Sequence, residues 1–188
     1  MALERTFAEL NRRLKALQDA LDALSTTVEE DRPKRRDVVV AQSLGDAVLA
    51  ARGLVEESRS AANEATQAVV QRSDGDRMQR ALASCQEKFH RFLTQFASEL
   101  ISYERIDDLV NIARERGREW SHWVDVVRQE LEQCRLLAED VRDCLLLCWQ
   151  ELVERAGTTS VSVQNTTIGQ QIAAPELMAK EAVREGIT

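Results

Sequence analysis

Apolar residues recur along most of this chain with the spacing of helices that pack against other helices. In the first stretch they alternate at intervals of four and three residues, which is a sustained heptad pattern. The positions that carry this pattern are Leu3, Phe7, Leu10, Leu14, Leu17, Leu21, Leu24 and Val28. We expect a helix over about residues 2–31 that ends before Pro33, because the residue preceding a proline disfavours the α conformation.

The same spacing predicts a second helix over about residues 37–72, with mostly small residues on its apolar face. These are Ala41, Leu44, Val48, Ala51, Val55, Ser58, Ala62, Ala65 and Val69. We expect this helix to end in the sequence RSDGDR, where Gly75 suits a left-handed cap.

A third helix, over about residues 76–104, is predicted to carry larger apolar side chains. They are Met78, Leu82, Cys85, Phe89, Phe92, Phe96 and Tyr103. A face rich in Phe can pack closely against one rich in Ala, so we expect the second and third helices to be complementary.

A fourth helix is predicted from near Ile106 to about Arg155. Its apolar positions include Ile106, Leu109, Trp120, Trp123, Val127, Cys134, Leu137, Val141, Cys144 and Cys148. At 1.5 Å per residue it would be about 75 Å long, against about 45–50 Å for the others, so we expect a bend near Gly117. Short connections make successive helices antiparallel. The fold class is therefore all-α, an up-down-up-down four-helix bundle of long helices over residues 1–156, followed by a C-terminal extended tail over 157–188.

Composition narrows the functional classes. The chain has 188 residues, of which 44% are apolar and 30% charged, and a net charge of −7 disfavours broad nucleic-acid binding. The first residues carry a charge every few positions, unlike a signal peptide, and no apolar run reaches the length of a membrane span. We expect a cytoplasmic protein with reduced cysteines.

Candidate catalytic chemistry is sparse. Cys144 and Cys148 lie one helical turn apart and are open to a metal or redox reading, but all four cysteines occupy apolar-face positions, which favours packing. His90 and His122 have no partner constellation. The acidic pairs 29–30 and 107–108 are adjacent in sequence, so they lie on different sides of a helix. We predict no catalytic residue, no cofactor and no metal site.

The tail differs from everything before it. The segment SVSVQNTTIGQQI, residues 160–172, is nearly uncharged and rich in β-branched and amide side chains, which is typical of segments that pair with copies of themselves. Val161 and Val163 would share one face of a strand, and Ile168, Gln170 and Ile172 would share a face after a change of phase around Asn165–Thr167. The predicted self-association residues are Val161, Val163, Asn165, Ile168, Gly169, Gln170, Gln171 and Ile172.

A helical bundle followed by a short glycine- and amide-centred motif resembles the bacterial Bell proteins, which are similar to fungal HeLo domains and to the four-helix domain of necroptosis effectors. In the motif Gly169, Gln170 and Gln171 would correspond to the central element, with β-branched flanks. The resemblance implies a cell-death effector in prokaryotic immunity that receives an amyloid-templated signal and acts on a membrane when activated. This chain differs from that pattern in its charged first helix and in continuing past Pro175.

Other readings of the tail remain open. It can be a plain linker, or a β-arm that pairs with a partner's sheet edge. A short helix predicted over 176–185 can also dock on another subunit, which would make the chain a homo-oligomeric coiled-coil scaffold or adaptor for a protein partner. The basic residues of PKRR, 33–36, can either touch anionic lipid or lie in a solvated loop.

Overall fold

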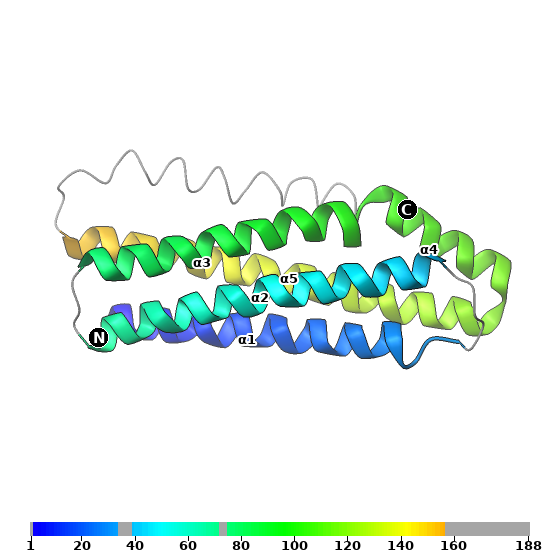
Figure 1. Cartoon of the computed structure of the whole chain (residues 1–188), viewed down its shortest axis with the longest axis horizontal. Coiled ribbons are helices and arrows are strands. Elements are labelled where there is room, and N and C mark those ends of the chain that lie inside the picture. The colour runs from blue at the N-terminus through cyan, green and yellow to red at the C-terminus, as the bar shows by residue number, and fades with distance from the viewer. Residues whose placement is uncertain (1, 34–38, 72–74, 157–188) are drawn as a thin grey trace.

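The structure, a computed structural model, is all-helical over the residues it describes, 2–33, 39–71 and 75–156. These contain five α-helices and one π-helical turn (Figure 1). In chain order they are α1 (Ala2–Glu29), α2 (Val39–Val70), α3 (Gly75–Gln95), η1 (Phe96–Leu100), α4 (Tyr103–Arg116) and α5 (Arg118–Ala156). The predicted all-α class and the first two helices are confirmed.

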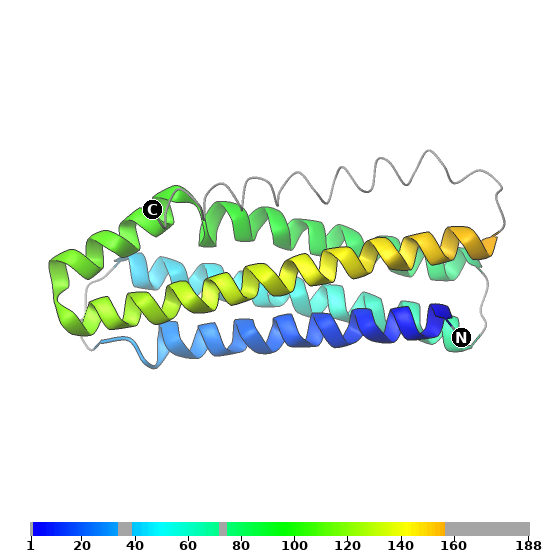
Figure 2. The same cartoon turned by 180° about the vertical axis from the view of Figure 1, so that it is seen from behind.

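The helices lie side by side in one elongated bundle (Figures 1 and 2). α1 packs between α2 and α5, α3 packs along α2, and α4 packs on α5 at one end. Side-chain bonds give the direction of α5 relative to α1: the hydroxyl of Thr6 donates to Glu151 at 2.6 Å, and that of Thr27 to Glu130 at 3.0 Å. Partner numbers fall in α5 as they rise in α1, so this pair is antiparallel.

The apolar positions predicted from the heptad spacing form the core. In α1 and α2 every one of them is at most 5% exposed. In α5, Leu137 is only partly buried and packs on the edge of the core. The Phe side chains of α3 and η1 contact one another in sequence, with ring centroids 5.5 Å apart for Phe89–Phe92 and for Phe92–Phe96. The residues that the local apolar spacing predicted to be buried are therefore almost all found in the core.

The third predicted helix ends earlier than the pattern indicated. After Gln95 the backbone forms the π-helical turn η1, closed by the amide of Ile101 donating to the carbonyl of Phe96 at 3.1 Å. Ser102 then caps a new helix by accepting from the amide of Arg105. The wider turn changes the helical phase, and Tyr103, predicted in the core, is 55% exposed.

The fourth predicted helix is in fact two. Gly117 was correctly expected to interrupt it, but as a bend, whereas here the chain reverses and α5 runs back along α4 (Figures 1 and 2). Gly117 has φ 92° and ψ −174°, a conformation essentially restricted to glycine, and that allows the reversal. Residues 103–116 therefore extend the line of α3 rather than that of α5.

The left-handed cap expected at Gly75 was wrong, because Gly75 is the first residue of α3. Among the described glycines only Gly117 has a positive φ. The basic residues 34–36 fall outside the described part of the chain.

Candidate interaction surface

The cysteines, the strongest candidates for chemistry, lie in the core. Cys85, Cys134, Cys144 and Cys148 are all free thiols and at most 1% exposed. Burial raises the pKa of Cys85 and of Cys134 to about 12, because a thiolate is poorly solvated there. The packing role predicted for these two thiols agrees with their positions.

Cys144 and Cys148 interact with each other across one turn of α5. The Cys148 thiol stabilises the Cys144 thiolate by hydrogen bonding, which lowers the pKa of Cys144, and the nearby charge of Arg13 acts in the same direction. The same hydrogen bond raises the pKa of Cys148. Cys144 also donates weakly to the carbonyl of Thr6, at 3.7 Å. In the described parts of the chain no three His, Cys, Asp or Glu side chains gather as a metal site.

The other candidate groups do not converge. His122 is exposed, and His90 is half-buried, with a buried Nδ1 that has no hydrogen-bond partner. The acidic pairs 29–30 and 107–108 are fully on the surface. Trp120 and Trp123 were predicted on the apolar face of the fourth helix, and they are buried in an edge-to-face pair with centroids 5.4 Å apart. The two indole rings therefore belong to the core.

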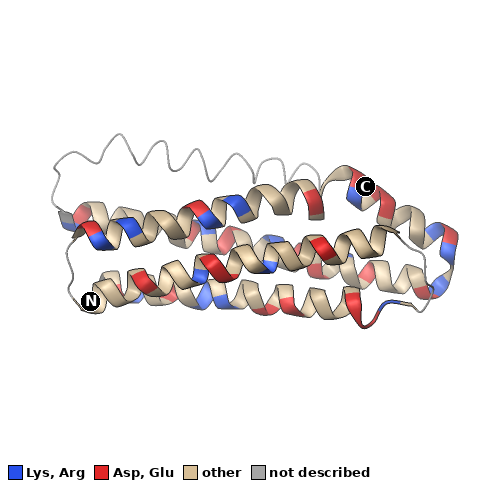
Figure 3. Ribbon diagram, viewed as in Figure 1, with Lys and Arg blue, Asp and Glu red and all other residues tan. Residues whose placement is uncertain are grey.

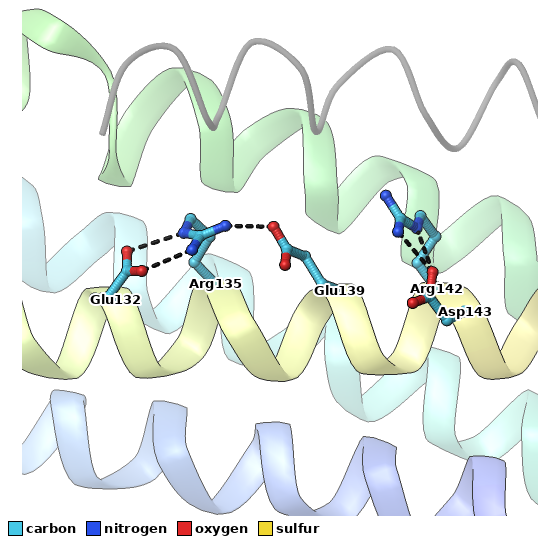
Figure 4. A network of polar contacts seen from close by, with 5 residues as sticks. All are labelled: Glu132, Arg135, Glu139, Arg142 and Asp143. Atoms are coloured by element: carbon cyan, nitrogen blue, oxygen red, sulfur yellow. Dashed lines mark hydrogen bonds and ion pairs between the residues drawn. The ribbon is translucent and has the colours of Figure 1, made fainter. Parts of the chain in front are cut away.

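A row of charged residues follows α5 on the side away from α1 and toward α3 (Figure 4). Arg135 pairs with Glu132 at 2.6 Å on one side and with Glu139 on the other. One turn further, Arg142 pairs with Asp143 at 2.6 Å. The side chains of Arg135 and Arg142 are only 14% and 19% exposed. Charges this sheltered are unusual on an outer helix face, so the row marks a candidate recognition surface.

The row lies beside the line where α3 meets α5. These two helices approach each other less closely than α1 and α2, α1 and α5, or α2 and α3 do. Toward one end of this line the indole of Trp149 donates to the buried amide oxygen of Gln86 at 2.8 Å. We call the line along which α5 faces α3, from Trp149 to Glu132, the α3–α5 line. No sequence signal identified it, since it depends on which helices become neighbours.

Elsewhere both signs of charge are interspersed along the helices (Figure 3). The ion pairs are mostly short-range pairs within one helix, such as Arg12–Glu9 at 2.6 Å, which contribute little to stability. Arg52 of α2 with Asp22 of α1, at 2.7 Å, is one that joins two helices. The α5 row therefore differs from the remaining surface in the low solvent exposure of its arginines more than in the signs of its charges.

The residues predicted for self-association lie outside the described residues, as does the predicted short helix 176–185. These are Val161, Val163, Asn165, Ile168, Gly169, Gln170, Gln171 and Ile172. α5 ends at Ala156, shortly before this segment begins at residue 160. The described residues thus place its attachment point at one end of the bundle.

Comparison with protein families, with curated proteins and with solved structures gives no match for this chain. Among the described helices none combines the length and the hydrophobicity needed to cross a bilayer.

Proposed function

We propose that this chain is a non-enzymatic helical-bundle interaction protein whose residues 160–172 mediate assembly. The observation that carries the proposal is that the helices of the bundle pack against one another around a shared core. Apolar residues from Leu3 to Leu152 form one core, and some of the polar groups that enter it bond from helix to helix, as Trp149 does to Gln86. Such a bundle is a stable carrier for the attached segment.

The arrangement of the helices supports an up-down-up-down bundle. In this interpretation α3, η1 and α4 together form the third rod, and α5 alone forms the fourth. Together with the motif-like tail, this architecture supports a cytoplasmic cell-death effector in prokaryotic immunity that associates with a membrane when activated. The trigger would be a protein partner, or another copy of the chain, that presents a matching segment.

Assembly is tested by light scattering of the full chain beside a version that ends at Gly157. We expect open-ended, dye-binding fibrils from the full chain after seeding, and none from the truncated chain. The bundle itself should melt at the same temperature in both, because α5 has its last buried residue at Leu152. Fibrils from the truncated chain would place assembly in the bundle and contradict the proposal.

Residue-level evidence comes from seeding the 157–188 peptide. Gly169→Pro removes a backbone donor from the proposed stack, and Gln171→Lys places like charges about 4.8 Å apart along it. We expect fibril growth from the wild-type peptide and little from either variant. Equal growth in all three peptides, or none from the wild type, would exclude 160–172 as the assembling segment.

The second candidate function is a homo-oligomeric scaffold whose C-terminal arm docks on another subunit or partner protein. It is favoured by Leu136 and Leu147, which are 45% and 50% exposed on α5. At this spacing they lie on one stripe of the helix, where a second copy can cover both. A discrete oligomer that is lost on truncation at Gly157 would support the scaffold instead of the fibril.

A further inference from the structure

The outer face of α5 carries a second stripe of positions with heptad spacing, separate from the stripe that packs into the core. We call it the outer stripe. It recurs at alternating intervals of three and four residues and consists of Gln133, Leu136, Asp140, Asp143, Leu147 and Gln150. All six residues are exposed, and the two leucines belong to the few large apolar residues that are exposed in the described helices. A helix face with this spacing is suited to pairing with another helix.

The order of residues in the outer stripe is symmetric about its centre, which lies between residues 141 and 142. Read from either end, the order is glutamine, leucine, aspartate, aspartate, leucine, glutamine. In an interface between two identical chains related by a two-fold axis, the same surface is used twice and must be complementary to itself. An antiparallel helix pair centred here places Leu136 against Leu147 of the second copy, and Gln133 against Gln150 of the second copy.

Helical geometry brings these matched positions to face each other. At 3.6 residues per turn, all six positions lie within about 50° of one direction, and the two leucines lie within about 10° of it. The glutamines are the positions furthest from that direction, so they flank the contact. The leucines are therefore placed where the two helices approach most closely.

The exposed face of α2 shows that this symmetry does not follow from heptad spacing alone. It has a stripe with the same intervals, in which Leu49 is 57% exposed. Paired antiparallel with itself, that stripe would place Leu49 against Ser60 and Gly53 against Glu56. The α2 stripe is not complementary to itself, whereas the outer stripe of α5 is.

The central aspartates bring like charges together in such a pair, and each copy has arginines beside them. Arg142 donates to the carboxylate of Asp143 at 2.6 Å. From α1, Arg13 donates to the main-chain carbonyl of Asp140 at 3.0 Å, which brings its positive charge close to that residue. These cations reduce the repulsion between the carboxylates of the two copies.

We propose that two copies of this chain associate through the outer stripe of α5, as an antiparallel, two-fold symmetric helix pair. The leucines form two equivalent apolar contacts, one on each side of the axis, and the glutamines hydrogen-bond at the two ends. The pairing deepens the second candidate function, on whose self-association it rests, but it uses no residue after Gln150. It is therefore independent of 160–172 and of the C-terminal arm.

The pairing is tested by size-exclusion chromatography with light scattering of the full chain, unseeded, over a range of concentrations. We expect the mass of two chains at high concentration. Leu136→Lys and Leu147→Lys should each raise the dissociation constant at least about tenfold, because each substitution removes both leucine contacts of the dimer. The matched control is Leu49→Lys, at an equally exposed leucine of α2, which should leave the dissociation constant unchanged.

Cysteine cross-linking identifies the orientation. The native thiols are at most 1% exposed and do not compete. A mixture of Leu136→Cys and Leu147→Cys chains should form a disulfide-linked dimer on mild oxidation. Either variant alone should not, because residue 136 and its copy lie about 17 Å apart along the pair, beyond the reach of a disulfide. Efficient cross-linking of each variant with itself would indicate a parallel pair and overturn the proposal.

The centre of the pair is tested by the double variant Asp140→Asn, Asp143→Asn. Removing the opposed carboxylates should tighten the dimer severalfold, since like charges that face each other across paired elements are destabilising. An unchanged or weaker dimer would show that the aspartates of the two copies do not meet, and would exclude the two-fold axis at this place.

Truncation separates this proposal from the functions proposed above. The dimer should persist in the chain that ends at Gly157, whereas an oligomer lost on truncation would assign the contact to residues 157–188 and overturn the pairing. An oligomer that persists in Leu136→Lys would also overturn it and leave the scaffold function standing. A single chain at every concentration, up to the millimolar range, would contradict both. Fibril growth from residues 160–172 is decided separately, by seeding.

Discussion

Thr6 and Thr27 make equivalent contacts with α5 although three heptads of α1 separate them. Each hydroxyl donates to a glutamate, Glu151 for Thr6 and Glu130 for Thr27, and the two glutamates are separated by the same interval in α5. The register of the antiparallel pair is therefore kept along its whole length. Two helices stay in register over this distance when both follow a seven-residue period, as in a coiled coil.

The main-chain carbonyls of Thr6 and Thr27 also accept from side chains of α5, with the same spacing between their partners. The carbonyl of Thr27 accepts from the indole of Trp123 at 2.9 Å, and that of Thr6 accepts from Cys144 at 3.7 Å. Trp123 and Cys144 are again three heptads apart. The buried indole bond is the stronger of the two, because sulfur is a weak donor.

Trp123→Phe should destabilise the protein by about 1–3 kcal/mol, since the ring is kept but a buried hydrogen bond is lost. Urea denaturation followed by circular dichroism measures the change. The neighbouring exposed residue supplies the control: His122→Gln should change stability by less than about 0.5 kcal/mol. Equal effects of the two substitutions would show that the indole bond contributes nothing.

Trp149→Phe leaves the amide of Gln86 buried without its partner, and we expect a loss of about 1–3 kcal/mol. Adding Gln86→Met removes the stranded amide as well and should recover most of that loss. A double-mutant cycle of unfolding free energies measures the coupling. Additive losses in the double variant would contradict a direct bond between the two side chains.

Gly117→Ala should destabilise the fold by about 1–3 kcal/mol, because the backbone conformation at the reversal is strained for any residue with a Cβ. Gly53 is the matched control. It lies within α2, and a Cβ added there would meet no heavy atom within 4 Å, so Gly53→Ala should stabilise by about 0.5–1 kcal/mol. The melting temperatures of the two variants should therefore shift in opposite directions. Shifts in the same direction would contradict a backbone conformation at Gly117 that only glycine tolerates.

Stability should fall as pH rises above about 9. Burial raises the pKa of Cys85 and Cys134 from 9.0 to about 12, so the unfolded chain loses these protons first. Their contribution is complete below pH 9 and is lost progressively between pH 9 and 12, with a slope of up to about 1.4 kcal/mol per pH unit for each thiol. Urea denaturation at about pH 8 and at about pH 10.5, on either side of the onset of this loss, measures the slope.

The control for the pH prediction is the double variant Cys85→Ala, Cys134→Ala. It will be less stable at every pH because it leaves cavities, but its stability should depend less steeply on pH. The same slope in both proteins would mean that other groups cause the alkaline loss.

The local spacing of apolar residues was enough to predict the helical class, the approximate extents of α1 and α2, and the burial of residues such as Leu14 and Cys134. Helix formation and the face a helix buries depend on neighbours three and four residues away, which a single sequence contains. Gly117 was identifiable as an interruption because an interior glycine destabilises a helix and the predicted helix was unusually long.

What only the tertiary structure decided are relations between distant residues. The reversal at Gly117, the phase change that exposes Tyr103, and the bond between Gln86 and Trp149 each depend on which helices become neighbours and in what register. The α5 row illustrates the difference. Its charged residues can be read from the sequence, but the low solvent exposure of Arg135 and Arg142 on the side of α5 toward α3 cannot. Side-chain packing between helices selects one register among several that the heptad spacing allows equally, so spacing alone cannot place the α5 row beside α3.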